Sequence, residues 1–278
     1  MYIRQPAVAG SFYPGDPDKL KSMINGFLKD AEADKPEIRG NIYGIISPHA
    51  GYVYSGPVAG YGFSYLSHLN IDTYIILAPS HRARFKGASV IPRGIYSTPL
   101  GNMDIDSDMG EELVKLEGFG FIPEAHELEH SLEVQVPFVQ VVSEGSKIVP
   151  VIIGTTDLNL CRHIGESIAS AIRKDKNYAV IISTDLSHYH SYNSAIELDN
   201  KIIKSIESFD ENKLSILLQS GKAEACGEGP LISGMYLCRS MGAKKAVVVK
   251  YANSGDTAGS KDRVVGYLSA VFYSNEKE

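Results

Sequence analysis

The chain has 278 residues, with 27 Lys and Arg against 33 Asp and Glu and a formal net charge of -6 at pH 7. Its 44% apolar and 22% charged residues are typical of a globular protein and exclude a disordered or fibrous chain. The acidic balance argues against a nucleic-acid-binding surface, and no apolar run reaches the ~18 residues of a membrane span. The amino-terminal MYIRQPAVAG lacks the apolar core of a signal peptide, and three cysteines are too few for a disulfide framework. We therefore expect a cytoplasmic protein with neither nucleic acid nor a membrane as a partner.

Amphipathic stretches and short β-branched runs alternate along the chain. The first helix is predicted to begin after Asp16, with Pro17 at its first position. The further elements, in chain order, are a strand at 42–47, a helix at 56–69, a strand at 73–78, a helix at 106–117, a strand at 148–153, a helix at 158–174, a strand at 178–183, helices at 194–209, 211–220 and 230–241, and strands at 246–251 and 264–272. The strands are nearly continuous apolar runs, as in sheets covered on both faces. This pattern predicts one α/β domain over residues 1–278, a layered sheet with helices on both faces.

Polar side chains of the kind that bind ligands follow four of the predicted strands. They are His49, His81, Asp185 with His188, and Asn253 with Asp256. In open α/β sheets, ligands bind beyond the carboxyl ends of the strands. We therefore expect these groups to contribute to one site.

Two further residues are candidates for the same site. His130 begins an apparent helix after a loop, where Ser131 is expected to cap the helix with Glu133 in its first turn. Cys226 is preceded by Ala225, followed by Gly227, and lies just before the helix at 230–241. A helix amino terminus is expected to lower the pKa of a thiol and to favour the thiolate, the form that binds metals or attacks electrophiles.

Two chemistries fit these residues. Two imidazoles and one thiolate supply three metal ligands and leave a position open, a donor set that suits zinc, copper or iron. The alternative is metal-free, with Cys226 as the nucleophile, a histidine as the base and Asp185 as the group that orients it. Arg82 and Arg84 follow His81 and either meet an anionic substrate or lie in a solvated loop.

Seven ordered segments resemble the Memo family, which in archaea and bacteria is labelled AmmeMemoRadiSam system protein B. They are PAVAGSFYP (6–14), PHAGYVYSG (48–56), APSHR (78–82), EHSLEVQVPF (129–138), STDLSHY (183–189), CGEGP (226–230) and YANSGD (251–256). Together they span nearly the whole chain. EHSLEVQVPF is the most specific of them.

The resemblance implies a fold similar to that of LigB-type class III extradiol dioxygenases, which use nonheme iron. It implies that His49, His81 and Cys226 line a metal pocket and that His188 corresponds to the catalytic histidine of the dioxygenases. Asp185 and His130 belong to the same pocket by this resemblance. Cys226 stands where the dioxygenases have a carboxylate ligand, so extradiol ring cleavage is not carried over.

The function implied by the resemblance is a metalloenzyme with redox activity that binds Fe or Cu, with Zn as a further possibility, and acts on a small molecule. In it His188 is the acid–base group, and Asp185 and His130 support the ligands. The prokaryotic family label implies a functional association with AMMECR-type and radical-SAM proteins. Two alternatives stay open: a non-catalytic module that binds a peptide or small ligand in the same pocket, and a metal-free Cys-His-Asp hydrolase.

Overall fold

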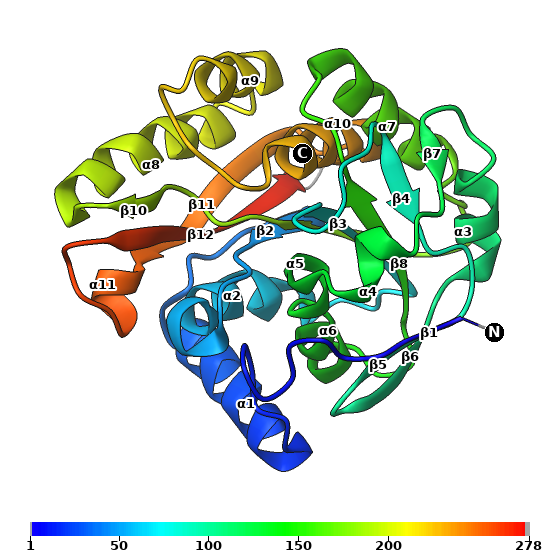
Figure 1. Ribbon diagram of the computed structural model, residues 1–278, viewed down its shortest axis with the longest axis horizontal. Helices are drawn as coiled ribbons and strands as arrows, with labels where there is room; N and C mark the ends of the chain where they lie inside the picture. Colours follow the sequence, from blue (N-terminus) through cyan, green and yellow to red (C-terminus); the bar gives the residue numbers. More distant parts are fainter. Residues whose placement is uncertain (1, 276–278) are drawn as a thin grey trace.

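A nine-stranded sheet forms the centre of the computed structural model, which describes residues 2–275 (Figure 1). The strand order is β10-β12-β2-β9-β3-β8-β4-β7, with β11 paired to β12. The bounds are β2 Asn41–Ser47, β3 Thr73–Pro79, β4 Ala88–Val90, β7 Phe119–Gly120, β8 Lys147–Ile153, β9 Tyr178–Ser183, β10 His188–His190, β11 Lys245–Asn253 and β12 Val264–Ser274. The middle strands β2, β9, β3 and β8 are parallel, whereas β12 and β4 flank them antiparallel. A second sheet contains β1 Ile3–Arg4, β5 Ile95–Thr98 and β6 Gly101–Asp104.

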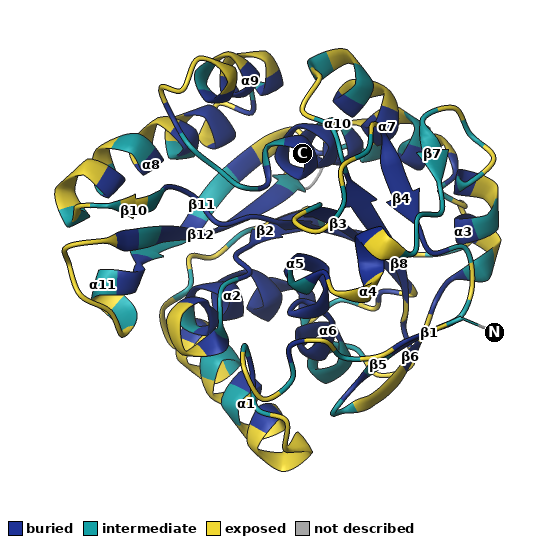
Figure 2. Cartoon of the chain, in the orientation of Figure 1, coloured by how far each residue is buried: buried dark blue, intermediate teal, exposed yellow. Residues whose placement is uncertain are grey.

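Helices cover both faces of the large sheet, which confirms the predicted fold class (Figures 1 and 2). One face carries α1 Pro17–Asp34, α2 Tyr52–Leu66, α5 His130–Glu133 and α6 Val136–Val142. The other carries α7 Leu158–Ser170, α8 Tyr192–Glu207, α9 Glu211–Gln219 and α10 Glu228–Met241. The shorter helices are α3 Ser107–Leu113, α4 Glu124–Glu127 and α11 Ser254–Thr257.

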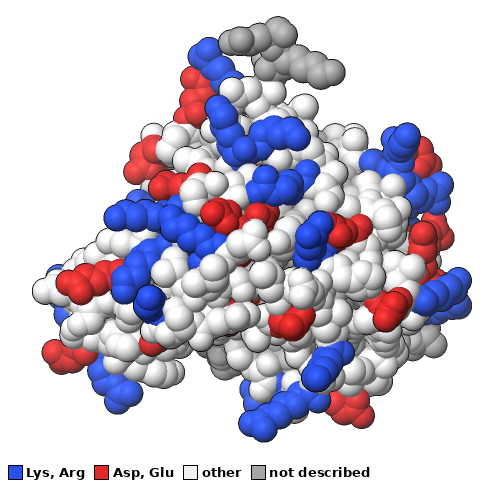
Figure 3. All heavy atoms as spheres, turned by 90° about the horizontal axis from the view of Figure 1, so that it is seen from above, with Lys and Arg blue, Asp and Glu red and all other residues white. Residues whose placement is uncertain are grey.

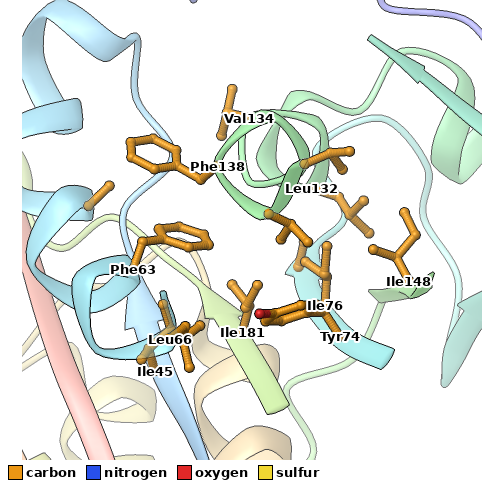
Figure 4. Packing of buried hydrophobic residues seen from close by; sticks show 14 of the residues in the cluster. Ile45, Phe63, Leu66, Tyr74, Ile76, Leu132, Val134, Phe138, Ile148 and Ile181 are labelled. Atoms are coloured by element: carbon orange, nitrogen blue, oxygen red, sulfur yellow. The ribbon is translucent and has the colours of Figure 1, made fainter. Parts of the chain in front are cut away.

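The central strands divide their side chains between two hydrophobic cores. On β3, Tyr74 and Ile76 lie in the core under α2 and α6, and Ile75 and Leu77 lie in the core under α7 and α10. Figure 4 shows the first of these cores, with Phe63 and other apolar side chains packed above the sheet. All seven residues of β3 are buried, so the apolar runs in the sequence reflect strands covered on both faces.

Several element boundaries differ from the sequence prediction. Helix α2 begins at Tyr52 rather than 56, because the Tyr52 N–H donates to the Phe12 carbonyl (2.7 Å) and Pro57 is accommodated inside the helix. Because Pro57 has no N–H, only the Val53 carbonyl loses its helical hydrogen bond. Val53 is 61% exposed, so water can donate to that carbonyl instead. Helix α3 ends at Leu113 rather than 117.

The sequence also predicted that Asn253 and Asp256 contribute to the site, but they serve another purpose. The Asn253 side chain accepts from the Gly255 N–H (2.9 Å), and Asp256 accepts from the Asn253 N–H (3.0 Å). Together they form the capping box of α11. The Asn253 side-chain oxygen and the Asp256 carboxylate are thereby used to begin a helix.

Within residues 2–275, no helix combines the length and apolar character that crossing a membrane requires. On the face drawn in Figure 3, basic and acidic side chains are interspersed over a largely uncharged surface. The cytoplasmic location and the lack of a nucleic-acid partner stay predictions.

Candidate metal centre

The order of the parallel strands brings His49, His81 and Cys226 together. Strand β9 lies between β2 and β3, and Ser47 at the end of β2 pairs with Ser183 at the end of β9. The loops that leave β2 and β3 carry His49 and His81, and the loop before α10 brings Cys226 to the same edge. One ligand atom from each of these three residues lies within 4.8 Å of the others.

The hydrogen bonds around His49 determine which ring nitrogen carries its proton. The Ser183 hydroxyl donates to the Ser131 carbonyl (2.7 Å) and accepts from the Gln135 Nε2 (2.9 Å). The orientation of the Gln135 amide group is fixed, because the atom that faces Ser183 also contacts the Pro48 carbonyl (3.0 Å), which can only accept, and must therefore be the nitrogen. The Ser183 oxygen therefore accepts from His49 Nδ1 (2.9 Å), which leaves the lone pair on His49 Nε2. Burial lowers the pKa of His49, and any protonation of the neighbouring histidines acts in the same direction, so the ring stays neutral.

A carboxylate orients His81 in the same way. The Glu129 Oε1 lies 2.8 Å from His81 Nδ1, and Oε2 accepts from the His81 backbone N–H (2.6 Å). Burial opposes ionisation of Glu129, but hydrogen bonds from His81 and Ser131 and the coulombic attraction of His81 outweigh it and lower the Glu129 pKa to about 2. An ionised Glu129 fixes the proton on His81 Nδ1 and leaves Nε2 free to bind a metal, as in the carboxylate–histidine pairs common at metal sites.

Cys226 completes the group of three donors. Its Sγ lies 3.1 Å from His49 Nε2, and because that nitrogen carries the lone pair, the thiol donates to it. The backbone N–H of Asp185 donates to Cys226 Sγ (3.3 Å), which ties the cysteine to the loop after β9. Burial raises the pKa of the Cys226 thiol, with the Asp185 charge acting in the same direction. The low pKa expected from the helix amino terminus is therefore wrong, because loss of hydration outweighs the helix.

The loop after β9 carries Asp185 and His188, and the two residues have different roles near these donors. The Asp185 Oδ1 accepts from the backbone N–H of His49 (2.7 Å), and burial raises its pKa to about 7. Its carboxyl group thus holds the His49 backbone, whereas the His49 ring is oriented by Ser183. His188 Nδ1 donates to the Leu186 carbonyl (2.7 Å), which leaves the lone pair on His188 Nε2.

Comparison with known proteins connects this geometry to a family. The model of the Memo-like protein family matches residues 4–271. The chain belongs to that family. A MEMO1 family protein of Sulfurisphaera tokodaii is 41% identical, and one of Nitrosopumilus maritimus is 38% identical, each over 97% of this chain and 99% of its own length. The crystal structure of an uncharacterized protein from Escherichia coli K12 covers 83% of this chain and 99% of its own with a TM-score of 0.56, but at 14% identity it shows the fold alone.

His130 of this Memo-family protein lies beside the three donors. Its ring stacks on His81, with centroids 4.8 Å apart and planes at 24°, and its centroid is 5.5 Å from that of His49. His81, Glu129 and His130 form a second group with ligand atoms within 4.8 Å. Both Glu129 oxygens already accept hydrogen bonds, so this second group is less suited to bind an ion. Burial lowers the pKa of His130 to about 4, so it is a neutral neighbour of His81.

The orienting residues Ser183, Gln135 and Glu129 are absent from the sequence-based site. Ser183 ends an apolar strand and Gln135 lies between apolar residues, so only their spatial neighbours reveal their role. The expected cap at Ser131 is wrong as well. Glu129 caps α5 by accepting the Ser131 N–H (3.1 Å), and the Ser131 hydroxyl contacts Glu129 and the Pro79 carbonyl.

The three donors of this Memo-family protein fit a metal ion chemically. Two imidazoles whose Nδ1 atoms are engaged by Ser183 and Glu129, together with a cysteine sulfur, form a mixed nitrogen and sulfur set. This set suits zinc, copper or iron and does not suit magnesium or calcium. Three protein ligands leave a coordination position open. A metal ion binds the thiolate, so binding releases the thiol proton.

Proposed function

We propose that this Memo-family protein is a redox-active metalloenzyme in which His49, His81 and Cys226 hold one iron or copper ion. The observation that carries the proposal is the arrangement of hydrogen bonds outside the donors. Ser183 and Glu129 each occupy an Nδ1 atom, so that both imidazoles keep the lone pair on Nε2. A site evolved to bind a metal needs this orientation of its ligands.

The residues around the donors would support the chemistry of a bound metal. Iron or copper, when bound, supplies electron transfer and an open position for substrate or oxygen. His188 is neutral and has a free Nε2, so it can accept a proton there and return it. Asp185 holds the His49 backbone, and His130 covers one face of the His81 ring. These groups keep the ligands in place.

The contact between Cys226 Sγ and His49 Nε2 also matches a cysteine–histidine pair of a hydrolase. Three features favour the metal instead. The thiol pKa is raised, which disfavours a free nucleophile, and the orientation of His81 by Glu129 has no purpose in a Cys–His pair. The Asp185 carboxyl group bonds to the His49 backbone and not to its ring.

Alkylation of Cys226 separates the two functions. Protein treated with a chelator and protein loaded anaerobically with Fe(II) or Cu(I) are exposed to iodoacetamide, and modified peptides are quantified by mass spectrometry. Cys161 and Cys238 are fully buried and provide internal controls. The proposal predicts that metal suppresses alkylation of Cys226. Fast alkylation that metal does not change would contradict it and favour the hydrolase.

A further inference from the structure

A second feature lies beside the donor group: a cavity of about 270 Å³ that has Cys226 in its wall. The loops after β3 and β8 and the start of α10 enclose it. Because β3 and β8 are adjacent and parallel, both loops leave the same edge of the sheet as the donors. Its volume lies slightly below the range of about 300–1,000 Å³ typical of ligand pockets, so the cavity suits a molecule smaller than a drug.

One cation lines this cavity, and no acidic residue does. Arg84 is that cation, and among residues 2–275 its guanidinium has neither a salt bridge nor a hydrogen bond. The neighbouring Arg82 differs, since its Nε donates to the Leu128 carbonyl (3.2 Å) and its side chain is absent from the cavity wall. An unpaired guanidinium presents five donors suited to carboxylate or phosphate oxygens.

The rest of the wall offers hydrogen-bond donors at one part and apolar surface at another. Thr155 Oγ1 accepts from the Asp157 N–H (3.2 Å), which leaves its hydroxyl hydrogen free to donate. The first turn of α10 borders the cavity at Gly229 and Pro230, and burial raises the pKa of the Glu228 carboxyl group in that turn to about 7. Phe85 and Pro230 supply the apolar surface. A small organic anion with an apolar body matches this combination.

We infer that this cavity binds the substrate of the proposed enzyme, and that the substrate is a small organic acid whose carboxylate or phosphate oxygens pair with Arg84. The inference rests on the proposed function where it identifies the ligand as the substrate. Cys226 connects the two, since it belongs to the donor group and also to the cavity wall. A ligand that pairs with Arg84 and fills the cavity therefore also meets the part of the wall that contains Cys226.

Binding of simple probes tests the inference. Benzoate and phenyl phosphate supply the two kinds of anion, and benzamide is the neutral control of the same shape. Each is titrated by calorimetry into the wild type and into the Arg84→Ala, Arg84→Lys and Lys86→Ala variants, with and without anaerobically added Co(II). Lys86→Ala is the matched control, because it removes one exposed positive charge from the same loop without touching the cavity.

The expected result is that at least one anion binds the wild type and Lys86→Ala equally, whereas Arg84→Ala binds it about five- to tenfold more weakly. Arg84 is exposed, so the difference should shrink at high salt. Three results would overturn the inference: benzamide binds the wild type as tightly as the anions do, Arg84→Ala binds the anions as tightly as the wild type does, or neither anion binds the wild type. Which anion binds more tightly distinguishes a carboxylic acid from a phosphate ester.

The absorption spectrum of the Co(II)-loaded protein distinguishes a failure of this inference from a failure of the proposed function. Cobalt bound to Cys226 should give a thiolate charge-transfer band, and an anion in the cavity should shift it in the wild type but not in Arg84→Ala. A band that no anion shifts contradicts the inference and leaves the metal site standing. Arg84-dependent binding without any thiolate band supports the anion site and contradicts the metalloenzyme.

Discussion

The Ser183 hydroxyl oxygen accepts a hydrogen bond from His49 Nδ1 (2.9 Å), and this contact decides the tautomer of a proposed metal ligand. Ser183 can act only as an acceptor there, because its own proton goes to the Ser131 carbonyl. Gln135 completes the arrangement by donating to Ser183 and to the Pro48 carbonyl. A buried chain of neutral hydrogen bonds thus directs one lone pair toward Cys226.

Replacing Ser183 with alanine should weaken metal binding about 10- to 100-fold, because His49 loses the partner that holds its proton on Nδ1. The free energy of unfolding should fall by about 1–3 kcal/mol, since Gln135 and Ser131 each lose a buried partner. Competition with a chromophoric chelator gives the metal affinity, and urea unfolding gives the stability. Ser187→Ala, which replaces a buried serine in the loop after β9, is the control. An unchanged affinity in Ser183→Ala would refute the tautomer argument.

Glu129→Gln tests the corresponding contact at His81. Glutamine keeps the shape of the side chain but replaces one of two accepting oxygens with a donor, so it cannot accept from both the ring and the backbone of His81. We expect metal affinity to fall about 10- to 100-fold. Glu127→Gln removes the same charge from an exposed position and should leave the metal affinity unaltered. If the two variants bind metal alike, Glu129 does not orient His81.

The fold was largely predictable from the sequence, because each main strand is an apolar run and each main helix has a polar boundary. The short strands β1, β4, β5, β6, β7 and β10 were missed, since elements of two to four residues show no periodicity. His49 and His81 were singled out because polar residues at strand ends stand out against apolar runs, and Cys226 because it lies next to a glycine just before a predicted helix. Ser183 did not stand out, and its role depends on which residues meet it in space.

Buried His126 should make stability depend on pH. Burial and the Arg4 charge lower its pKa from 6.5 to about 3, so the folded protein keeps this ring neutral while the unfolded chain protonates it below about pH 6.5. Protonation therefore favours the unfolded state, and its contribution lowers stability as the pH falls from about 6.5 toward 3. The slope from this group approaches about 1.4 kcal/mol per pH unit.

Urea unfolding at several pH values, on the wild type and on His126→Gln, measures this contribution. His126→Gln should be less stable near pH 7, because the ring packs in the interior and contacts the Ser89 hydroxyl (2.9 Å). Its stability should nevertheless fall less steeply between pH 6 and pH 4. Parallel curves for the two proteins would show that His126 does not titrate as described.

The metal content of protein purified without oxygen and without an affinity tag tests the central claim most directly. Elemental mass spectrometry compares the wild type with His49→Ala, His81→Ala and Cys226→Ser, and His188→Ala serves as the control outside the donor group. The account predicts nearly one iron or copper ion per wild-type chain, retained in His188→Ala and lost in the other three. A wild type that holds no metal, even after anaerobic reloading, would contradict it.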